Sequence, residues 1–234
     1  MTRRRWIADE FSETHAALTG PHAAHLARTL RAKIGQEFQV ACGDRVRLAV
    51  VQAVALDRVE FALREEVLAP VAVPITLLLA IFKFDRMEWA IAKCTELNVT
   101  TIIPIIARRT EKHLALAAVK RAERWRRIAR EAAEQSRRVA PPEIGAPAKL
   151  SQALTHDAEL RVVLSESERE MALSDLVRSR EEVRSMALAV GPEGGWTPEE
   201  LQAFSQSQWI AVSLGETILR AETAAIAALA VARS

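Results

Sequence analysis

Cysteine and histidine are scarce in this chain, and neither is spaced as a metal or redox site requires. Cys42 and Cys94 are the two cysteines among 234 residues, and no C-x-x-C pair occurs. The five histidines form no metal-ligand pattern. These absences exclude a disulfide scaffold and a structural zinc site as the basis of the fold, and we expect a site that holds no metal.

Long apolar runs are missing as well. No positively charged start leads into an apolar run of the signal-peptide form, and no apolar stretch reaches the roughly 18 residues of a membrane span. We therefore expect a soluble, cytoplasmic protein that binds no membrane. Because 50% of the residues are hydrophobic, the chain can bury a substantial core in one large domain or two small ones.

Three common catalytic motifs are absent. The chain has no G-x-G-x-x-G after a strand, no G-x-x-x-x-G-K-[ST] and no G-x-S-x-G. A dinucleotide enzyme, a nucleoside triphosphatase and a serine hydrolase therefore lose most of their support. No histidine follows His156, so catalysis near the C-terminus must depend on carboxylate, guanidinium, hydroxyl or backbone groups.

Glycine is rare but clustered. Four of the eight glycines fall within residues 191–224, a stretch that begins with Gly191-Pro192-Glu193-Gly194-Gly195 and runs into an Ala-rich segment. Glycine allows positive φ and the close approach of a ligand to the backbone. The cluster therefore predicts a binding site built largely from main-chain atoms.

Charge is unevenly distributed along the chain. Residues 108–138 carry 11 Lys or Arg against 4 Asp or Glu, whereas residues 151–234 carry 7 against 13. The basic segment is either a contact surface for a polyanion or a solvated helix face that keeps the protein soluble. We predict a helix over residues 116–137 with Trp125 on its packed side and four cations on its solvent side: Lys120, Arg127, Arg130 and Arg137.

The N-terminal part is predicted to form a small β-rich domain. Strand-like runs cover residues 37–41, 45–53 and 58–63. Residues 21–33 are predicted to be helical, with His22, Leu26 and Leu30 along one side. Two prolines and small residues make 67–74 the predicted linker.

After the linker the pattern is typical of a parallel α/β sheet. Buried strands are predicted at residues 75–82, 100–107, 160–164, 186–190 and 209–214. The helix expected after the first of these strands carries Met87, Ala90, Ile91 and Cys94 on one stripe, so we expect Cys94 to be a core residue and not a nucleophile. Thr197-Pro198-Glu199-Glu200 has the form of a capped helix start. Residues 221–232 are apolar nearly all round, which predicts a helix buried in the domain or in a subunit interface.

An ordered set of motifs along the chain carries a family resemblance. Gly191-Pro192-Glu193-Gly194-Gly195 pairs with Leu214-Gly215-x-x-Ile218-Leu219-Arg220-x-Glu222-Thr223-Ala224. The supporting matches are Arg4-Arg5-Trp6, His25-Leu26-x-Arg28-x-Leu30-Arg31-x-Lys33-x-Gly35, Lys83-x-x-Arg86-x-Glu88, Lys93-x-Thr95-Glu96-Leu97, Arg124-Trp125 and Glu134-Gln135-Ser136. In this set the chain resembles the RsmE family of 16S ribosomal RNA uracil-N3 methyltransferases, which belongs to the SPOUT class.

The resemblance implies a fold, a cofactor and partners. It implies a PUA-like RNA-binding β-barrel over residues 1–70 and a SPOUT α/β domain with a trefoil knot over residues 74–234. It also implies S-adenosylmethionine as cofactor, ribosomal RNA or the small ribosomal subunit as partner, and a homodimer whose subunits build the active site together. Three departures from the family pattern are Asn98, Thr217 and Ala221.

Site residues follow from the same resemblance. The implied cofactor-binding residues are Leu164, Ser165, Glu166, Gly191, Pro192, Glu193, Gly195, Leu214, Gly215, Ile218, Leu219 and Ala221. The candidate RNA-binding residues come from the matching motifs, the basic N-terminus and the basic helix, and they are Arg3, Arg4, Arg5, Arg28, Arg31, Lys83, Arg86, Lys120, Arg124, Arg127, Arg130 and Arg137. The three candidate catalytic residues are Arg220, Glu193 and Glu222.

Chemistry assigns the catalytic roles. Uracil N3 is a poor nucleophile while it holds its proton, so a fixed cation should stabilise the anion, and a guanidinium remains charged. Arg220 is therefore the first choice for the cation. Glu193 or Glu222 is the candidate proton acceptor. In the alternative interpretation Glu222 has no catalytic role, and it only neutralises the positive start of a helix or pairs with Arg220.

Two rival functions stay open. One is another SPOUT methyltransferase that acts on a different RNA position, such as a ribose 2′-hydroxyl. The other is a non-catalytic RNA-binding or ribosome-assembly protein, in which the basic helix and the N-terminal domain bind phosphate and the glycine-rich loop only turns the chain. Binding of S-adenosylmethionine would separate the enzymes from the non-catalytic protein.

Overall fold

The computed structural model describes residues 5–68, 72–180 and 182–234. The chain divides into two compact units. Unit 1 comprises Met1–Val71 together with Arg130–Pro141, and unit 2 comprises Ala72–Ala129 together with Pro142–Ser234. Each unit has its own hydrophobic core, so each is described separately.

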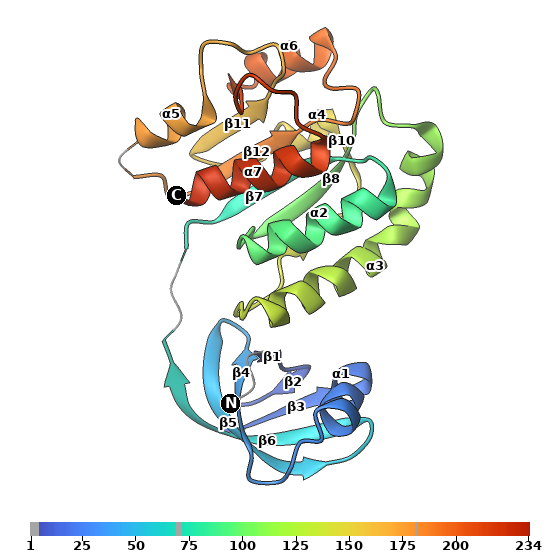
Figure 1. The fold of residues 1–234 in the computed structure, drawn as a ribbon, viewed down its shortest axis with the longest axis vertical. Coiled ribbons are helices and arrows are strands. Elements are labelled where there is room, and N and C mark those ends of the chain that lie inside the picture. Colours follow the sequence, from blue (N-terminus) through green and yellow to red (C-terminus); the bar gives the residue numbers. More distant parts are fainter. Residues whose placement is uncertain (1–4, 69–71, 181) are drawn as a thin grey trace. The chain divides into compact units, whose positions relative to one another are not determined.

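Unit 1 is built on a curled six-stranded sheet (Figure 1). Its strands are β1 (Trp6–Ile7), β2 (Glu10–Phe11), β3 (His15–Thr19), β4 (Glu37–Cys42), β5 (Arg45–Val54) and β6 (Arg58–Val67). They lie in the order β1-β4-β5-β6-β3-β2, and every pair is antiparallel except β1 with β4. The three strands predicted from the sequence are confirmed as β4, β5 and β6, whereas the short strands β1 to β3 had no clear sequence pattern.

The helical segment of unit 1 is shorter than predicted. Helix α1 (Gly20–Ala24) continues into a π-helical turn over His25–Thr29 and ends there. Arg31 has φ 51°, in the left-handed region, so the helix cannot continue to residue 33. Leu26 is fully buried, but Leu30 lies beyond the last turn and is exposed, which corrects the predicted packing side.

Residues 130–141 pack within unit 1. The fully buried Glu134 carboxylate pairs with His22 Nδ1 at 2.8 Å and with Arg130 Nε at 3.5 Å. Arg130 Nη2 lies 2.8 Å from an Asp9 carboxylate oxygen and donates to the Ile7 carbonyl at 2.7 Å. Since a buried carboxylate is costly unless it is paired, these contacts hold the segment in place.

Unit 2 contains a parallel sheet in the order β10-β8-β7-β12-β11-β13, with β9 paired to β8. The strands are β7 (Ile75–Ala80), β8 (Thr101–Ile106), β9 (Glu143–Ile144), β10 (Ala148–Lys149), β11 (Leu160–Leu164), β12 (Met186–Val190) and β13 (Ile210–Val212). Every pairing is parallel, as the β-α-β pattern predicts. Strand β12 lies between β7 and β11, so a late segment occupies the centre of the sheet.

Successive side chains of the central strands point to opposite faces of the sheet, and each face packs against its own layer of helices. Leu77 and Leu79 belong to the core with α2 (Phe84–Glu96), α3 (Lys112–Gln135), α5 (Leu173–Arg178) and α7 (Ala221–Arg233). Leu78 and Ala80 face the core of α4 (Leu150–Ala153) and α6 (Pro198–Gln206). Because successive strand side chains point to opposite faces, an all-apolar strand such as β7 requires both layers.

Helix α7 packs against α2 and α5 (Figure 1). Ala225, Ala228 and Leu229 are fully buried, so this Ala-rich helix forms part of the core of unit 2. On α2, the predicted stripe that includes Met87 and Cys94 is also fully buried. No helix within the described ranges combines the length and apolar character needed to cross a membrane.

Candidate active site

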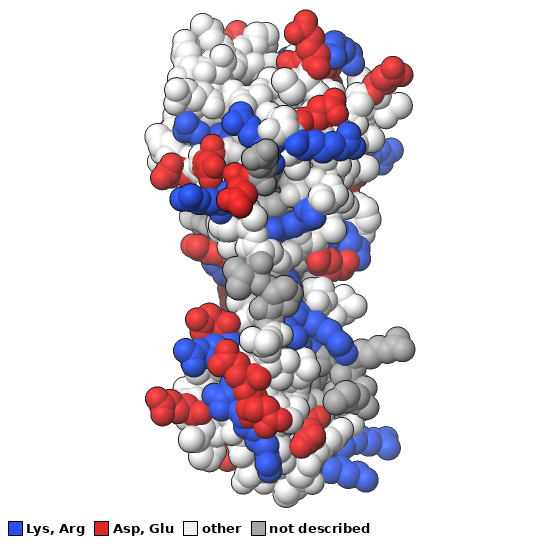
Figure 2. Space-filling view, turned by 90° about the vertical axis from the view of Figure 1, so that its left-hand side faces the viewer, with Lys and Arg blue, Asp and Glu red and all other residues white. Residues whose placement is uncertain are grey.

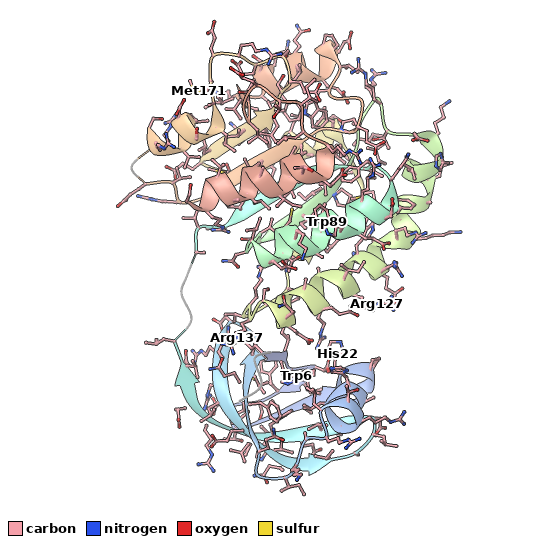
Figure 3. The ribbon with its side chains drawn as sticks, in the orientation of Figure 1. Trp6, His22, Trp89, Arg127, Arg137 and Met171 are labelled. Atoms are coloured by element: carbon pink, nitrogen blue, oxygen red, sulfur yellow. The ribbon has the colours of Figure 1, made fainter. Side chains whose placement is uncertain are left out.

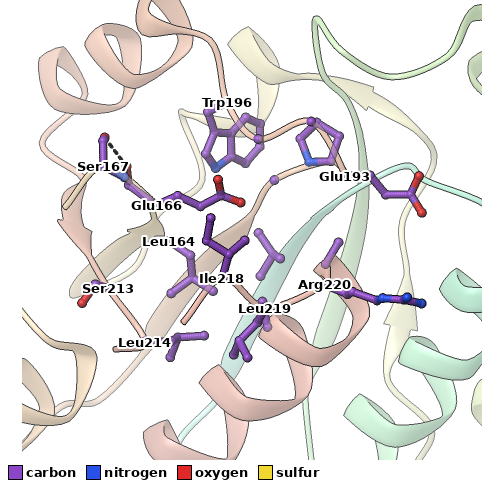
Figure 4. Close-up of a pocket in the computed structure, with 18 of the residues that line it drawn as sticks. Leu164, Glu166, Ser167, Glu193, Trp196, Ser213, Leu214, Ile218, Leu219 and Arg220 are labelled. Atoms are coloured by element: carbon purple, nitrogen blue, oxygen red, sulfur yellow. Dashed lines mark hydrogen bonds between the residues drawn. The ribbon is translucent and has the colours of Figure 1, made fainter. Parts of the chain in front are cut away.

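A cavity of about 430 Å³ opens in unit 2 where strands β11, β12 and β13 end (Figure 4). Its walls are the loops that follow these strands, together with the first residues of α7. Ligands in open α/β sheets bind at the carboxyl ends of the strands. Position and size therefore make this cavity the candidate active site.

The structure brings all the predicted cofactor-binding residues to this cavity. Its lining includes Leu164, Ser165, Glu166, Gly191, Pro192, Glu193, Gly195, Leu214, Gly215, Ile218, Leu219 and Ala221. These residues come from three segments far apart in the sequence. Their common position supports the prediction, and their role in binding stays a prediction.

The glycine loop, residues 191–196, has a conformation that favours glycine at two of its positions. Gly195 has φ 70°, and its N–H donates to the Pro192 carbonyl at 2.8 Å. A Cβ on Gly191 would come within 3.2 Å of the Trp196 indole nitrogen. Thr197 then caps α6: its hydroxyl accepts from Glu200 N at 3.3 Å, while Thr197 N donates to Glu200 at 2.9 Å. The predicted capping box is confirmed, and it fixes one end of the loop.

The loop after β11 is shaped by one carboxylate. Glu168 Oε1 accepts backbone N–H groups from Glu170 at 2.7 Å, Arg169 at 2.9 Å and Met171 at 3.1 Å. The N–H groups of Glu170 and Met171 hold the pKa of the Glu168 carboxyl below its usual range. Ser213, after β13, donates its N–H to Met171 and accepts from Leu173, so the two loops are joined.

Arg86, on α2, connects two of the candidate catalytic carboxylates. Its Nη1 donates to Glu193 Oε1 at 2.8 Å, and its Nε lies 3.8 Å from Glu222 Oε1. Glu193 lines the cavity, whereas Glu222 lies outside its lining and is buried. The second Glu222 oxygen is buried without a hydrogen-bond partner in the described structure. The structure thus pairs Glu222 with Arg86 and not with Arg220.

Arg220 lies just before α7, and its carbonyl accepts the Ala224 N–H at 2.8 Å. Its side chain is exposed and has no hydrogen bond or ion pair with any residue that the structure describes. Figure 4 shows Arg220 and Glu193 projecting toward the same side of the cavity. A guanidinium with no partner among the described residues can stabilise an anionic substrate, and a neighbouring carboxylate can accept the proton that the substrate loses.

Several predicted RNA-binding residues are engaged in contacts of their own. Arg124 donates to both Glu88 carboxylate oxygens, at 2.7 and 2.8 Å. Arg130 is half-buried and paired with Asp9, so the prediction that it projects to solvent is wrong. Arg5 donates to the Arg137 carbonyl and to Gln39. These guanidiniums make hydrogen bonds and ion pairs within the units, so their positions are accounted for without contact with RNA.

Other cations in the prediction are exposed. They are Arg28, Arg31, Lys83, Lys120, Arg127 and Arg137. Arg127 lies on the surface of α3 and Arg137 just beyond the end of that helix (Figure 3). On the face that Figure 2 shows, positive and negative side chains are interspersed within each unit, so that face offers no continuous cationic surface. Arg3 and Arg4 lie outside the described residues.

Arg109, Ser167 and Arg169 also line the cavity, although none of them was predicted from the sequence. Arg109 follows β8, and its Nη1 donates to the Gly194 carbonyl and, at 3.5 Å, to the Trp196 carbonyl. One signal was available, because Arg108-Arg109 directly follows the carboxyl end of a buried parallel strand. Trp196 is buried and packs edge-on against Phe204 at 4.9 Å between ring centroids, so it serves as a packing residue.

Neither Cys42 nor Cys94 lines the cavity. Burial raises the pKa of the Cys94 thiol to about 12, because the thiolate would lose its hydration. Cys94 is therefore a core residue, as its position in the α2 stripe predicts. In the described part of the chain, no group of three or more His, Cys, Asp or Glu is placed to hold a metal ion.

Solved structures with similar folds have methyltransferase names. One is a ribosomal RNA small subunit methyltransferase E from Neisseria gonorrhoeae bound to S-adenosyl methionine, with a TM-score of 0.85, 30% identity, and coverage of 97% of this chain and 95% of that one. Another is a putative methyltransferase from Legionella pneumophila in complex with the bound cofactor SAM, with a TM-score of 0.85, 28% identity, and coverage of 99% and 97%.

Sequence relatives agree with the structural ones. A ribosomal RNA small subunit methyltransferase E from Rickettsia conorii is 33% identical over 220 residues, which are 92% of this chain and 88% of the relative. The same-named protein from Bacillus subtilis is 31% identical over 91% of this chain and 87% of its own. The family model for an RNA methyltransferase domain matches residues 69–233. The chain therefore belongs to the ribosomal RNA small subunit methyltransferase E family.

Proposed function

We propose that this chain transfers a methyl group from S-adenosylmethionine to N3 of a uracil in small-subunit ribosomal RNA. The observation that carries the proposal is the cavity, where three loops predicted to bind the cofactor meet and where Arg220 and Glu193 project to one side. Family membership supports the reaction class and the RNA substrate. The choice of uracil N3 rests on the motif resemblance and on the charge chemistry of this site.

The residues at the cavity fit S-adenosylmethionine. The volume of about 430 Å³ lies in the range of small-molecule sites, and Leu164, Leu214 and Ile218 supply apolar surface for an adenine ring. Gly191 leaves open the space in which a Cβ would crowd the Trp196 indole. Glu166, Glu193 and Glu216 supply negative charge that suits a sulfonium or an ammonium group.

When bound, S-adenosylmethionine supplies an electrophilic methyl group on sulfur. The chain then has to hold the base, remove its N3 proton and exclude water. Arg220 stabilises the negative charge that spreads onto the uracil carbonyl oxygens, because a guanidinium remains charged and donates hydrogen bonds. Glu193 accepts the proton, directly or through a water molecule.

Glu193 is favoured over Glu222 as the proton acceptor for a geometric reason. A general base must reach the proton that it takes. Glu193 lines the cavity and is partly exposed, whereas Glu222 is buried outside it. Glu222 is then a structural partner of Arg86 at the start of α7.

We also propose the finer features of the fold that the family resemblance implies. Unit 1, with its curled sheet, acts as a PUA-like RNA-binding barrel, and the end of unit 2 forms a trefoil knot. The knot rests on the family resemblance, and the structure adds only that Ser213, directly after β13, pairs with the end of the loop after β11. Knots are rare exceptions to ordinary topology.

A homodimer is part of the proposal. Each subunit would contribute residues to the partner's active site. The protein would bind ribosomal RNA in the cytoplasm. Arg220 and Thr223 are exposed at the start of α7 and so are accessible to a second copy. Light scattering at working concentration should find the dimer mass, and monomers alone would contradict the shared site.

Two measurements test the function. Calorimetric titration should show that the full chain binds S-adenosylmethionine, and absence of binding would overturn the enzyme proposal. Mass spectrometry of ribosomal RNA from cells that lack the protein should then show the loss of one methyl group on a small-subunit uracil. Loss of a ribose methyl group would leave the enzyme class intact and would overturn the assignment of N3.

A further inference from the structure

We propose that Arg109 is a positioning residue that holds the glycine loop, residues 191–196, in the conformation that binds the cofactor. The inference rests on the proposed binding of S-adenosylmethionine at this cavity. Arg109 belongs to the segment between β8 and α3, far from the loop in sequence. The sequence of the glycine loop alone therefore does not identify this contact.

The glycine loop has little to hold it from within. Between the end of β12 and the cap of α6, its described internal backbone hydrogen bond is the one from Gly195 N–H to the Pro192 carbonyl. Gly194 and Gly195 are adjacent, and glycine has more backbone freedom to lose than any other residue. A loop of this composition samples many conformations unless contacts from another segment restrict it.

Arg109 supplies such a contact from outside the loop. Its Nη1 donates to the Gly194 carbonyl and lies 3.5 Å from the Trp196 carbonyl, on either side of Gly195. The aliphatic part of the side chain lies against Gly194, since a Cβ added there would come within 3.2 Å of Arg109 Cδ. Hydrogen bonds from a charged donor are stronger than neutral ones. The guanidinium thus fixes the two carbonyls that flank the left-handed glycine.

The backbone on either side of Arg109 is itself anchored. Arg108 N–H donates to Glu200 Oε1 at 2.8 Å, and Glu200 Oε2 accepts the Thr197 N–H at 2.9 Å. Ala107 N–H donates to the Thr110 hydroxyl at 3.1 Å. The buried Glu200 carboxylate therefore connects the residue before Arg109 to the residue after the glycine loop. Arg109 and the loop share one rigid support.

This arrangement predicts how the loop affects ligand affinity. A loop that must become ordered on binding opposes binding, and a loop held in place beforehand does not. Removal of the guanidinium should raise the mobility of residues 191–196 in the free protein. The Kd of S-adenosylmethionine should then rise about tenfold, the loss expected for one charge-assisted hydrogen bond.

The test compares Arg109→Ala with Arg109→Lys and with Arg108→Ala in the full chain. Hydrogen exchange of residues 191–196 is measured without ligand, with peptides from β12 and α7 reporting on the rest of the fold, and the Kd of S-adenosylmethionine is measured by calorimetry. Arg109→Ala should raise both loop exchange and Kd, and Arg109→Lys should recover part of each. Arg108→Ala should change neither loop exchange nor Kd, because Arg108 contacts Glu200 through its backbone N–H and not through its side chain.

Gly194→Ala gives an independent second variant. The added methyl group displaces Arg109 Cδ, so loop exchange and Kd should rise by less than in Arg109→Ala. In the double variant Arg109→Ala with Gly194→Ala, loop exchange and Kd should equal those of Arg109→Ala alone, because the Arg109 side chain that the methyl group would displace is absent. Full additivity would overturn the proposal.

Three further outcomes are decisive. Unchanged loop exchange and unchanged Kd in Arg109→Ala would overturn the positioning role. A raised Kd with unchanged exchange would also overturn it, because Arg109 would then contact the ligand directly. If the wild-type chain does not bind S-adenosylmethionine, the proposed function fails, and loop exchange in the free protein still decides whether Arg109 holds the loop.

Discussion

Arg86 of helix α2 donates a hydrogen bond to Glu193 of the glycine loop over 2.8 Å. The same guanidinium lies 3.8 Å from the buried Glu222. One cation thus lies between the two carboxylates that the sequence alone could not distinguish as proton acceptors. Only Glu193 also faces the cavity, and this difference can be tested.

Glu193→Gln should lower kcat about 100-fold, because the amide cannot accept the N3 proton and general base catalysis contributes about that factor. Glu222→Gln should retain most of the turnover. The measurement is single-turnover methylation of a small-subunit RNA fragment as a function of pH. The opposite ranking of the two variants would make Glu222 the acceptor.

Arg86→Met should lower the free energy of unfolding by about 2 kcal/mol, because the buried Glu222 loses its nearest cation. Urea unfolding measures the change. Adding Glu222→Gln to Arg86→Met should restore part of the stability, since the uncompensated buried charge is removed. If the second substitution destabilises the protein further, Glu222 is stabilised by something other than Arg86.

Arg220→Ala should reduce kcat about 100-fold or more, the usual effect of removing one donor to a developing negative charge. The Kd of S-adenosylmethionine should stay within a few-fold of the wild-type value. Arg178→Ala is a suitable control, because Arg178 is an exposed arginine on α5 and does not line the cavity. Normal turnover of Arg220→Ala would remove this residue from the mechanism.

Replacing Lys120 and Arg127 together by Ala should weaken RNA binding. The slope of log K against log salt should become shallower by about 1.4, because each of the two phosphate contacts releases about 0.7 counterion on single strands. Arg130 is left in place because it supports unit 1. Replacing Arg178 and Arg184 removes the same charge elsewhere and is the control. An unchanged slope would show that this face of α3 is only solvated.

Glu168 should titrate below its ordinary pKa of 4.5, because backbone N–H groups stabilise its carboxylate. A lowered pKa in the folded state means that its contribution to stability is complete above the unfolded pKa and is lost as pH falls through the folded one. An NMR titration should therefore place its midpoint below 4.5. A midpoint at or above that value would mean that the loop after β11 is not closed on Glu168 in solution.

Local patterns in the sequence were sufficient for most of unit 2. Continuous apolar runs predicted β7, β8, β11 and β12, the stripe through Met87 and Cys94 predicted the buried side of α2, and Thr197 with Glu200 predicted the start of α6. These features depend on neighbouring residues, and for that reason they can be predicted without knowing the fold. The helix over residues 21–33 was predicted too long because the left-handed Arg31 has no sequence signature.

Contacts between distant segments were decided by the tertiary structure. The sequence by itself determined the parallel α/β core, the three loop motifs and Arg220 as an arginine beside them. Only the fold brought Arg86 to Glu193, enclosed Arg130 and Glu134 within unit 1, and laid Arg109 on Gly194. The physical reason is that the orientation of an arginine depends on which carboxylate or carbonyl lies within reach, and the fold determines that separation.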